Sequence, residues 1–153
     1  HINDSSCHEL LEKLQPIGAF VYGSSIVGKK SLSLLGKVLN AHMGIVPQYR
    51  GAKSEFWALY RGEDDQIGYS IHECMSELDG GDLVFQARLP LVNGPSTCRV
   101  QSLIHLGGEL PKVWNFHMKG KSEPLEQLGD VGLYSTPRLW HRFKLGWRRN
   151  FWI

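Results

Sequence analysis

Residues 19–42 decide the fold of this chain, and they read AFVYGSSIVGKKSLSLLGKVLNAH. The first four form a short apolar run closed by Gly23, which is typical of a buried strand covered on both faces. A helix over about 29–35 and a second strand over 38–40 follow. A strand, a helix and a strand in this order make the unit of a parallel sheet with a right-handed crossover. The stretch therefore predicts an α/β fold, a mostly parallel sheet with flanking helices.

Apolar periodicity and turn signals on either side predict the remaining elements. Ser54 is expected to cap a helix, and Gly107-Gly108 is expected to end a helix that begins near Ser96. The strand-like runs 68–74 and 83–91 are joined by an acidic turn and predict a hairpin or near-hairpin. The other expected elements are a helix from Asp4 or Ser5 to just before Pro16, and a helix that starts near 134–137.

Length and composition indicate one globular domain, with 153 residues of which 42% are hydrophobic and 21% charged. No apolar stretch approaches the roughly 18 residues that span a bilayer, and no leader precedes the first helix. The 3 cysteines are scattered, without a Cys-x-x-Cys pair, so neither a disulfide framework nor a zinc knuckle is indicated. We therefore expect a soluble cytoplasmic protein that does not bind a membrane.

The positive charge lies at the carboxyl end, because several basic residues and no acidic residue follow Asp130. This pattern separates a core over 1–108 from a basic and aromatic carboxyl-terminal extension over 109–153. The extension is expected to cover the sheet or to form a subunit contact, as in a homo-oligomer. The alternative is binding of single-stranded nucleic acid through Trp140, Trp147 and Trp152.

An amide, an imidazole and a carboxylate predict a site for acyl transfer without a covalent nucleophile. Asn40 and His42 fall at the carboxyl end of a strand, where open α/β sheets bind ligands, and they lie on the same side of it. Both side chains can donate hydrogen bonds to the oxygen of a tetrahedral intermediate. Asp79, in a turn with glycines, can approach His42, favour its protonated form and accept a proton. Asp82 is a weaker alternative for that role.

Three motifs in this order resemble the folate-dependent formyltransferases, and the similarity runs from about Asn3 to about Leu106. The motifs are Asn40-x-His42, Pro47-x-Tyr49-Arg50-Gly51 and Leu78-Asp79-Gly80-Gly81. The resemblance implies a Rossmann-like core in which Asn40, His42 and Asp79 are catalytic. It further implies that 10-formyltetrahydrofolate donates a formyl group to a primary amine, without a metal. Members of the family carry another two or so strand–helix units before the position of His1, so we expect a core that lacks these units.

The resemblance also implies binding residues. The cleft for the donor is expected to be walled by Tyr22, Val46, Pro47, Met75 and Leu78. Tyr49 and Arg50 are expected to bind substrate, although Arg50 is as easily interpreted as a brace for the turn at Pro47. The family usually reads serine, leucine, leucine, proline where this chain has residues 44–47. We expect the glycine at position 44 to be tolerated because the backbone matters more there than a hydroxyl.

Other interpretations remain open. The acceptor is expected to be an amino-sugar nucleotide or another small amine rather than tRNA, because the residues after Gly108 are too few for the β-barrel that methionyl-tRNA formyltransferases append. A hydrolase that passes the formyl group to water resembles the same motifs, and so does a domain that binds without turnover. His72 and Cys74 are spaced as a metal-binding pair, but a sheet histidine explains His72 more simply.

Overall fold

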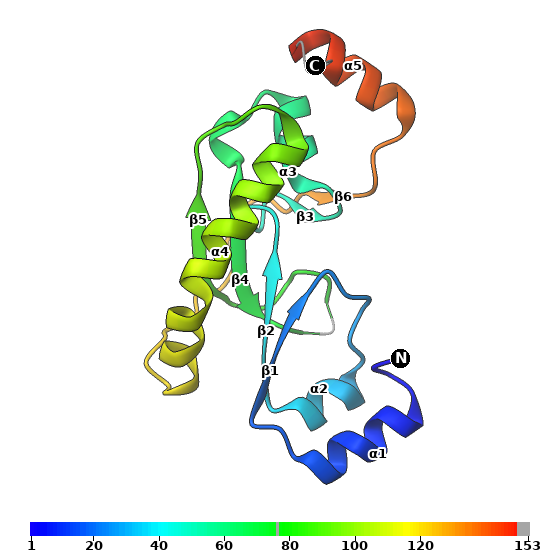
Figure 1. Cartoon of the computed structure of the whole chain (residues 1–153), viewed down its shortest axis with the longest axis vertical. Coiled ribbons are helices and arrows are strands. Elements are labelled where there is room, and N and C mark those ends of the chain that lie inside the picture. The colour runs from blue at the N-terminus through cyan, green and yellow to red at the C-terminus, as the bar shows by residue number, and fades with distance from the viewer. Residues whose placement is uncertain (76, 150–153) are drawn as a thin grey trace.

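The structure is a computed structural model of the chain, and it describes residues 1–75 and 77–149 (Figure 1). The elements in these ranges are α1 (Ser5–Leu14), β1 (Gly18–Tyr22), α2 (Lys29–Leu35), β2 (Lys37–His42), β3 (Arg50–Gly51), α3 (Ser54–Arg61), the 3-10 helix η1 (Asp64–Gln66), β4 (Gly68–Glu73), β5 (Leu83–Arg88), α4 (Gly94–Met118), β6 (Leu133–Tyr134) and α5 (Leu139–Arg149). The predicted α/β class, the strand–helix–strand unit over 18–42 and the hairpin of β4 and β5 are confirmed.

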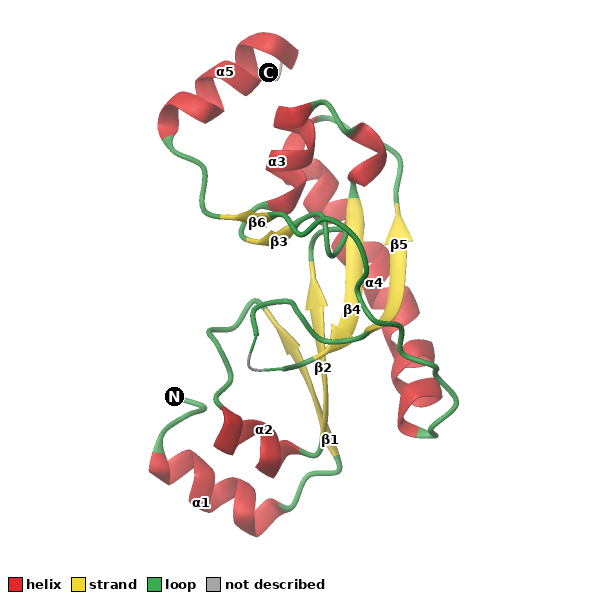
Figure 2. Ribbon diagram, turned by 180° about the vertical axis from the view of Figure 1, so that it is seen from behind, coloured by secondary structure: helices red, strands yellow, loops and turns green. Residues whose placement is uncertain are grey.

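The main sheet is mixed, with the strand order β1-β2-β4-β5 (Figure 2). Strands β1 and β2 are parallel, as predicted, and α2 forms their crossover. The pairs β2·β4 and β4·β5 are both antiparallel. The main sheet therefore combines one parallel pair with two antiparallel pairs, and the strand–helix–strand unit supplies its parallel part. The connection from β4 to β5 is a turn without the helix that a parallel return requires.

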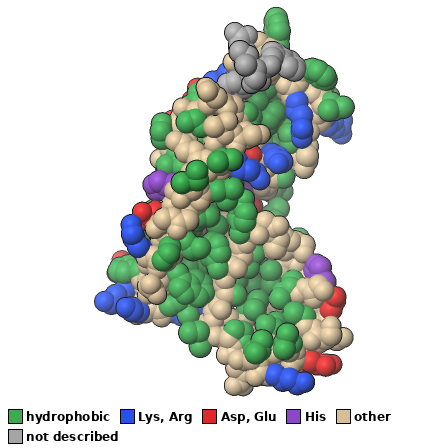
Figure 3. Space-filling model, in the orientation of Figure 1, with side chains coloured by type: hydrophobic (Ala, Val, Ile, Leu, Met, Phe, Trp, Pro, Cys, Tyr) green, Lys and Arg blue, Asp and Glu red, His purple; other side chains and the backbone are tan. Residues whose placement is uncertain are grey.

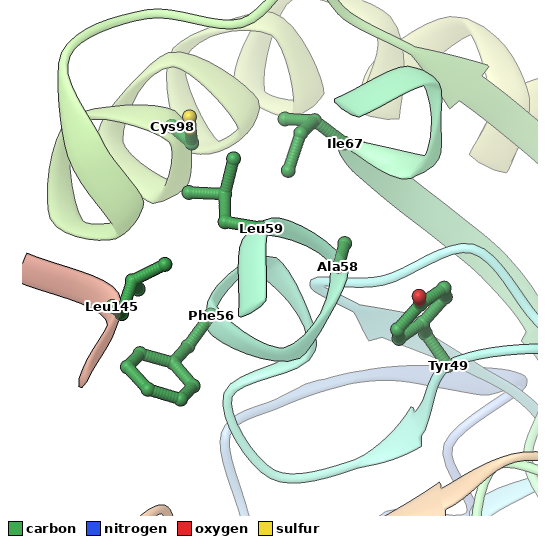
Figure 4. Close-up of a cluster of buried hydrophobic side chains, with 7 residues drawn as sticks. All are labelled: Tyr49, Phe56, Ala58, Leu59, Ile67, Cys98 and Leu145. Atoms are coloured by element: carbon green, nitrogen blue, oxygen red, sulfur yellow. The ribbon is translucent and has the colours of Figure 1, made fainter. Parts of the chain in front are cut away.

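Three apolar clusters hold these elements together. One lies between the sheet and α4 and contains Leu39 and Ala41 of β2. A second joins α1 and α2 to the opposite face of β1 and β2, where Val38 is buried. Alternate residues of β2 thus face opposite layers, and Asn40 and His42 share the face of Val38. The third cluster surrounds α3 and includes Leu145 of α5, as Figure 4 shows.

Helix α4 continues through Gly107-Gly108 to Met118, so the expected helix end at these glycines is wrong. Glycine in a helix costs about 1 kcal/mol relative to alanine. Leu110, Val113 and Trp114, beyond the glycines, pack on the sheet and offset that cost. The division expected after Gly108 consequently falls inside a helix. Hydrophobic side chains are visible at the surface on the face where α4 lies (Figure 3).

The segment after α4 returns along the sheet to the loop between β2 and α3. Its strand β6 pairs in parallel with β3, which the sequence analysis did not predict. Arg50 N–H donates to the Gly132 carbonyl (2.8 Å), and Gly132 N–H donates to the Pro47 carbonyl (3.1 Å). Figure 2 shows this segment, residues 119–134 and called the return segment below, running from the end of α4 to β6.

Helix α5 packs on α3 rather than on the sheet. Leu145 is buried there, and Arg149 donates to both carboxylate oxygens of Asp64 (2.8 and 2.6 Å). Trp140 and Trp147 are exposed, and Trp152 lies outside the described residues. In the part of the chain that the structure describes, no helix has both the length and the apolarity to cross a bilayer.

Candidate functional site

Asn40 and His72 lie opposite each other on β2 and β4. Asn40 Nδ2 is 3.1 Å from His72 Nε2. The other ring nitrogen of His72, Nδ1, donates to the Glu73 carbonyl (2.8 Å). His42 follows two residues after Asn40 and is buried on the same face of β2.

Asp79 is the residue on which these side chains converge. Its Oδ1 accepts from Asn40 Nδ2 (3.1 Å) and lies 3.5 Å from His72 Nε2. Its Oδ2 lies 3.2 Å from His42 Nδ1 and accepts from the Gly51 backbone N–H (2.9 Å). Asp79 has a φ of 50°, a left-handed conformation that aspartate tolerates better than most residues. The structure thus brings together Asn40, His42 and Asp79, as predicted.

The second ring nitrogen of His42 points into the protein. Its Nε2 donates to the Tyr49 carbonyl (2.6 Å) and lies 3.1 Å from Ser54 Oγ. Ser54 Oγ also donates to the Tyr49 carbonyl (2.9 Å). The expected cap at Ser54 is wrong, because Lys53 occupies the position before α3 and the Ser54 hydroxyl is used in this contact.

Gly44 lies against the same contact. A Cβ atom on Gly44 would be 2.6 Å from His42 Nε2 and 2.5 Å from Ser54 Cβ. The space that a side chain at position 44 would take is therefore filled by His42 and Ser54.

A cavity of about 450 Å³ opens beside the Asn40–His42–Asp79 group. Its walls come from the end of β1 and the loop after it, from β2, from residues 51–53, from the end of β4 and from the Asp79 turn. Tyr22, Met75 and Leu78 line it, as predicted for a donor cleft. Val46 and Pro47 are buried and are not among its lining residues.

The sequence as a whole matches a known family over this core. The family described as formyl transferase matches residues 3–106. This chain belongs to the formyl transferase family. Members of the family are one-carbon transferases, and their fold is the Rossmann-like α/β fold described above.

Three relatives illustrate the similarity. Phosphoribosylglycinamide formyltransferase of Escherichia coli K12 is 39% identical over 74 residues, which cover 46% of this chain and 34% of that protein. Methionyl-tRNA formyltransferase of Streptococcus thermophilus is 34% identical over 123 residues, which cover 79% of this chain and 39% of that protein. The chain thus spans little more than a third of these curated relatives.

The third relative is a solved structure, the formyltransferase PseJ from Anoxybacillus kamchatkensis in complex with UDP-4,6-dideoxy-4-formamido-L-AltNAc and tetrahydrofolate. It superposes with a TM-score of 0.63 at 18% identity, over 76% of this chain and 63% of that chain. At this identity the likeness shows the shared fold.

Tyr49 and Arg50 of this formyl transferase chain are not among the residues that line the cavity. Tyr49 is buried, and its hydroxyl donates to Glu63 Oε2 (2.6 Å). Arg50 is buried as well, and its Nη1 donates to Glu77 Oε1 (3.0 Å) while Nε and Nη2 donate to Gln127 Oε1 (3.0 and 2.8 Å). Both side chains brace the loop at 47–51, the second of the two roles considered for Arg50.

Two further residues of the group, His72 and Gln127, were not predicted as site residues from the sequence. His72 appeared there only as half of a metal-binding pair or as a sheet histidine, and its position opposite Asn40 was the available signal. Gln127 lies in the return segment, and no motif marked it. Gln127 reaches Arg50, Asp79 and Gly81 because the chain turns back along the sheet after α4.

Burial governs the electrostatics of the group. It lowers the pKa of His42, and the Asp79 carboxylate and the Tyr49 carbonyl oppose this effect only in part; His72 lowers the pKa further and Glu55 raises it. Burial would raise the pKa of Asp79, but hydrogen bonding by His72, the charge of His42 and the Gly51 N–H together hold it below its usual range. Asp79 is therefore ionised and His42 largely neutral at neutral pH.

The free energy of unfolding is expected to fall as the pH is lowered through about 6.5, the ordinary pKa of histidine. Burial lowers the pKa of both His42 and His117 in the folded chain. The unfolded chain therefore binds more protons below that pH, and acid favours unfolding. Asp79 adds to the loss only below its ordinary value of 3.8. Urea unfolding between pH 7.5 and 5 measures the effect, and His117→Gln should flatten it. Equal free energies across this range would contradict the expectation.

Proposed function

We propose that this chain is the catalytic core of an N-formyltransferase that moves a formyl group from 10-formyltetrahydrofolate to a primary amine. The observation that carries the proposal is the Asp79 carboxylate, held between Asn40, His42 and His72 beside a cavity in a chain of the formyl transferase family. Asn40, His42 and Asp79 are proposed as the catalytic residues.

The chemistry is attack of the amine nitrogen on the formyl carbon. A bond forms between these atoms, negative charge develops on the formyl oxygen, and the bond to the folate nitrogen then breaks and releases tetrahydrofolate. Asn40 and His42 are proposed to donate hydrogen bonds to that oxygen. In the structure the Asn40 amide is bound to Asp79 and His72, and His42 Nε2 is bound to the Tyr49 carbonyl while Nδ1 faces Asp79. Donation to the substrate therefore requires both side chains to exchange a partner.

The proton that leaves the amine has a nearby acceptor. Asp79 is proposed to take it, directly or through a water, or by way of His42 Nδ1 at 3.2 Å. A proton on Nδ1 makes His42 an imidazolium, which burial disfavours and the adjacent Asp79 carboxylate stabilises. The leaving folate nitrogen then receives a proton from the same pair.

The cavity suggests how donor and acceptor are held. Tyr22, Met75 and Leu78 are proposed to contact the apolar ring system of the folate. The proposed acceptor is an amino-sugar nucleotide or another small amine. Lys53 also lines the cavity, and its positive charge suits the phosphate groups of a nucleotide, whereas Arg99 there is already paired with Glu55.

The proposal is tested by the release of tetrahydrofolate from 10-formyltetrahydrofolate, followed by absorbance. The intact protein is incubated with a panel of amino-sugar nucleotides, with simpler amines and without amine. We expect release only when an amine is present, because water is a weaker nucleophile than an amine at the formyl carbon. Equal release of tetrahydrofolate without amine would contradict the transferase and indicate a hydrolase. Folate binding without release under any condition would replace it by a domain that binds without turnover.

A further inference from the structure

Gln127 uses its whole side-chain amide to join two parts of the candidate site. Its Oε1 accepts from Arg50 Nε and Nη2 (3.0 and 2.8 Å). Its Nε2 donates to the carbonyls of Asp79 (2.9 Å) and Gly81 (2.6 Å). An amide group offers two donors and two acceptor positions, so these four contacts fill its capacity.

The two donated hydrogen bonds fix the backbone on which the Asp79 side chain stands. Asp79 lies in a left-handed conformation, and the carbonyls on either side of Gly80 converge on one nitrogen of Gln127. A rotation of this backbone would carry the carboxylate away from His42 and from the Gly51 N–H. The conformation is costly for a residue other than glycine and persists where its surroundings determine it.

The accepted hydrogen bonds tie the same amide to the loop that carries Gly51. Arg50 precedes Gly51, whose N–H donates to Asp79, and Arg50 Nη1 also reaches Glu77 in the Asp79 turn. Gln127 therefore contacts both segments that meet at the carboxylate. It is partly buried although Glu126 and Leu128 beside it are exposed, so this side chain is directed inward from an exposed segment.

We propose that Gln127 is a positioning residue that holds the Asp79 turn so that the carboxylate faces His42. It does not line the cavity and is not assigned contact with substrate. The proposal rests on the proposed function for its effect on rate, but the geometry of the turn can be measured without turnover. The formyl transferase family matches residues 3–106, so Gln127 lies outside the matched region. A residue beyond that region is therefore proposed to position a side chain within it.

Two substitutions separate the contacts of Gln127. Gln127→Met keeps the length of the side chain and removes all four hydrogen bonds. Gln127→Glu keeps the acceptor for Arg50 and removes both donors to the Asp79 and Gly81 carbonyls. We expect both variants to lower kcat by about 10- to 100-fold, the size of effect that a displaced catalytic group produces. KM for the donor should change less than kcat, because Leu78 is the only proposed donor contact directly beside Asp79.

Gln66→Met is the matched control, since Gln66 lies in η1 and its side chain bonds only to Asp65 and Arg88 in the part of the chain described. Its kcat should equal that of the wild type. Wild-type kcat in Gln127→Glu would overturn the proposal, because the two donated hydrogen bonds would then be dispensable. An equal loss in Gln66→Met would overturn it as well.

The pH titration of His42, followed by NMR of the imidazole, decides the proposal when the wild-type protein transfers no formyl group. Asp79 and Glu55 raise the pKa of His42, while burial and His72 lower it. Loss of the fixed Asp79 contact should therefore move the His42 titration to lower pH in Gln127→Met, the variant that adds no charge of its own. An unchanged titration would overturn the positioning role, whereas a shift without turnover would overturn only the proposed function.

Discussion

Asp79→Asn is expected to lower the rate of formyl transfer by about 100-fold or more, and to cost less stability than Asp79→Ala because one of the two oxygens remains. The substitution removes the charge that favours protonated His42 and the group proposed to take the amine proton, a type of loss that costs about 10²- to 10⁴-fold. Asparagine keeps the shape, tolerates the left-handed conformation and can still accept from the Gly51 N–H, although its NH2 group then faces the Asn40 amide that donated to Asp79. Release of tetrahydrofolate measures the rate, and thermal unfolding measures the stability. Asp79→Ala is a poorer test, since it leaves the buried donors of Asn40 and Gly51 without an acceptor.

Asp82→Asn is the control for this prediction. Asp82 stands three residues away in the same acidic turn and was the weaker candidate for the proton acceptor. It is not a lining residue of the cavity, and its backbone carbonyl accepts from Glu73 N–H, which the substitution leaves in place. Turnover in Asp82→Asn should match the wild type. Wild-type turnover in Asp79→Asn, or equal losses in the two variants, would refute the proposed role of Asp79.

Gly44→Ala is expected to destabilise the fold by about 1–3 kcal/mol or more and to remove turnover. The added Cβ would lie 2.6 Å from His42 Nε2 and 2.5 Å from Ser54 Cβ, closer than packed atoms come. Relief requires the His42 ring to leave the Tyr49 carbonyl, which changes its contact with Asp79 as well. Urea unfolding and the tetrahydrofolate assay measure the two effects.

Gly107→Ala is the matched control, because the same substitution is made where nothing lies within 4 Å of the new Cβ. Gly107 is inside α4, where alanine is favoured over glycine by about 0.5–1 kcal/mol. The two variants should therefore change stability in opposite directions. A Gly44→Ala protein as stable as the wild type would show that the contact between His42, Ser54 and residue 44 adjusts freely.

The elements of the fold that local patterns determine were predictable. Apolar runs and turn residues predicted β1, α2, β2 and the hairpin, because the pattern that indicates each of these elements lies within a few residues. The direction of β4 relative to β2 was not predictable in this way, since it depends on the end of the sheet at which the chain re-enters. The predicted helix end at Gly107-Gly108 was wrong because packing beyond the glycines outweighs their low helix propensity.

The candidate site shows the same division. Asn40 and His42 are two residues apart on one strand, and glycines allow the Asp79 turn to approach them. The proximity of these three side chains could therefore be predicted from the sequence. His72 was hidden by the ordinary occurrence of histidine in sheets. Gln127 joins the group across 46 to 77 residues of chain, and no short-range pattern reports such a contact.

The parallel pairing of β3 with β6 predicts that the candidate site is completed late in folding. Gly51, whose N–H holds the Asp79 carboxylate, is paired with Tyr134, so this pairing joins residues 83 positions apart. Contacts between residues distant in sequence close large loops and form after local ones. During synthesis the sheet can therefore assemble before the Gly51 N–H is in place to bind the Asp79 carboxylate. We therefore expect the loop that carries Gly51 to reach its final position beside Asp79 only after the ribosome has released the residues of β6.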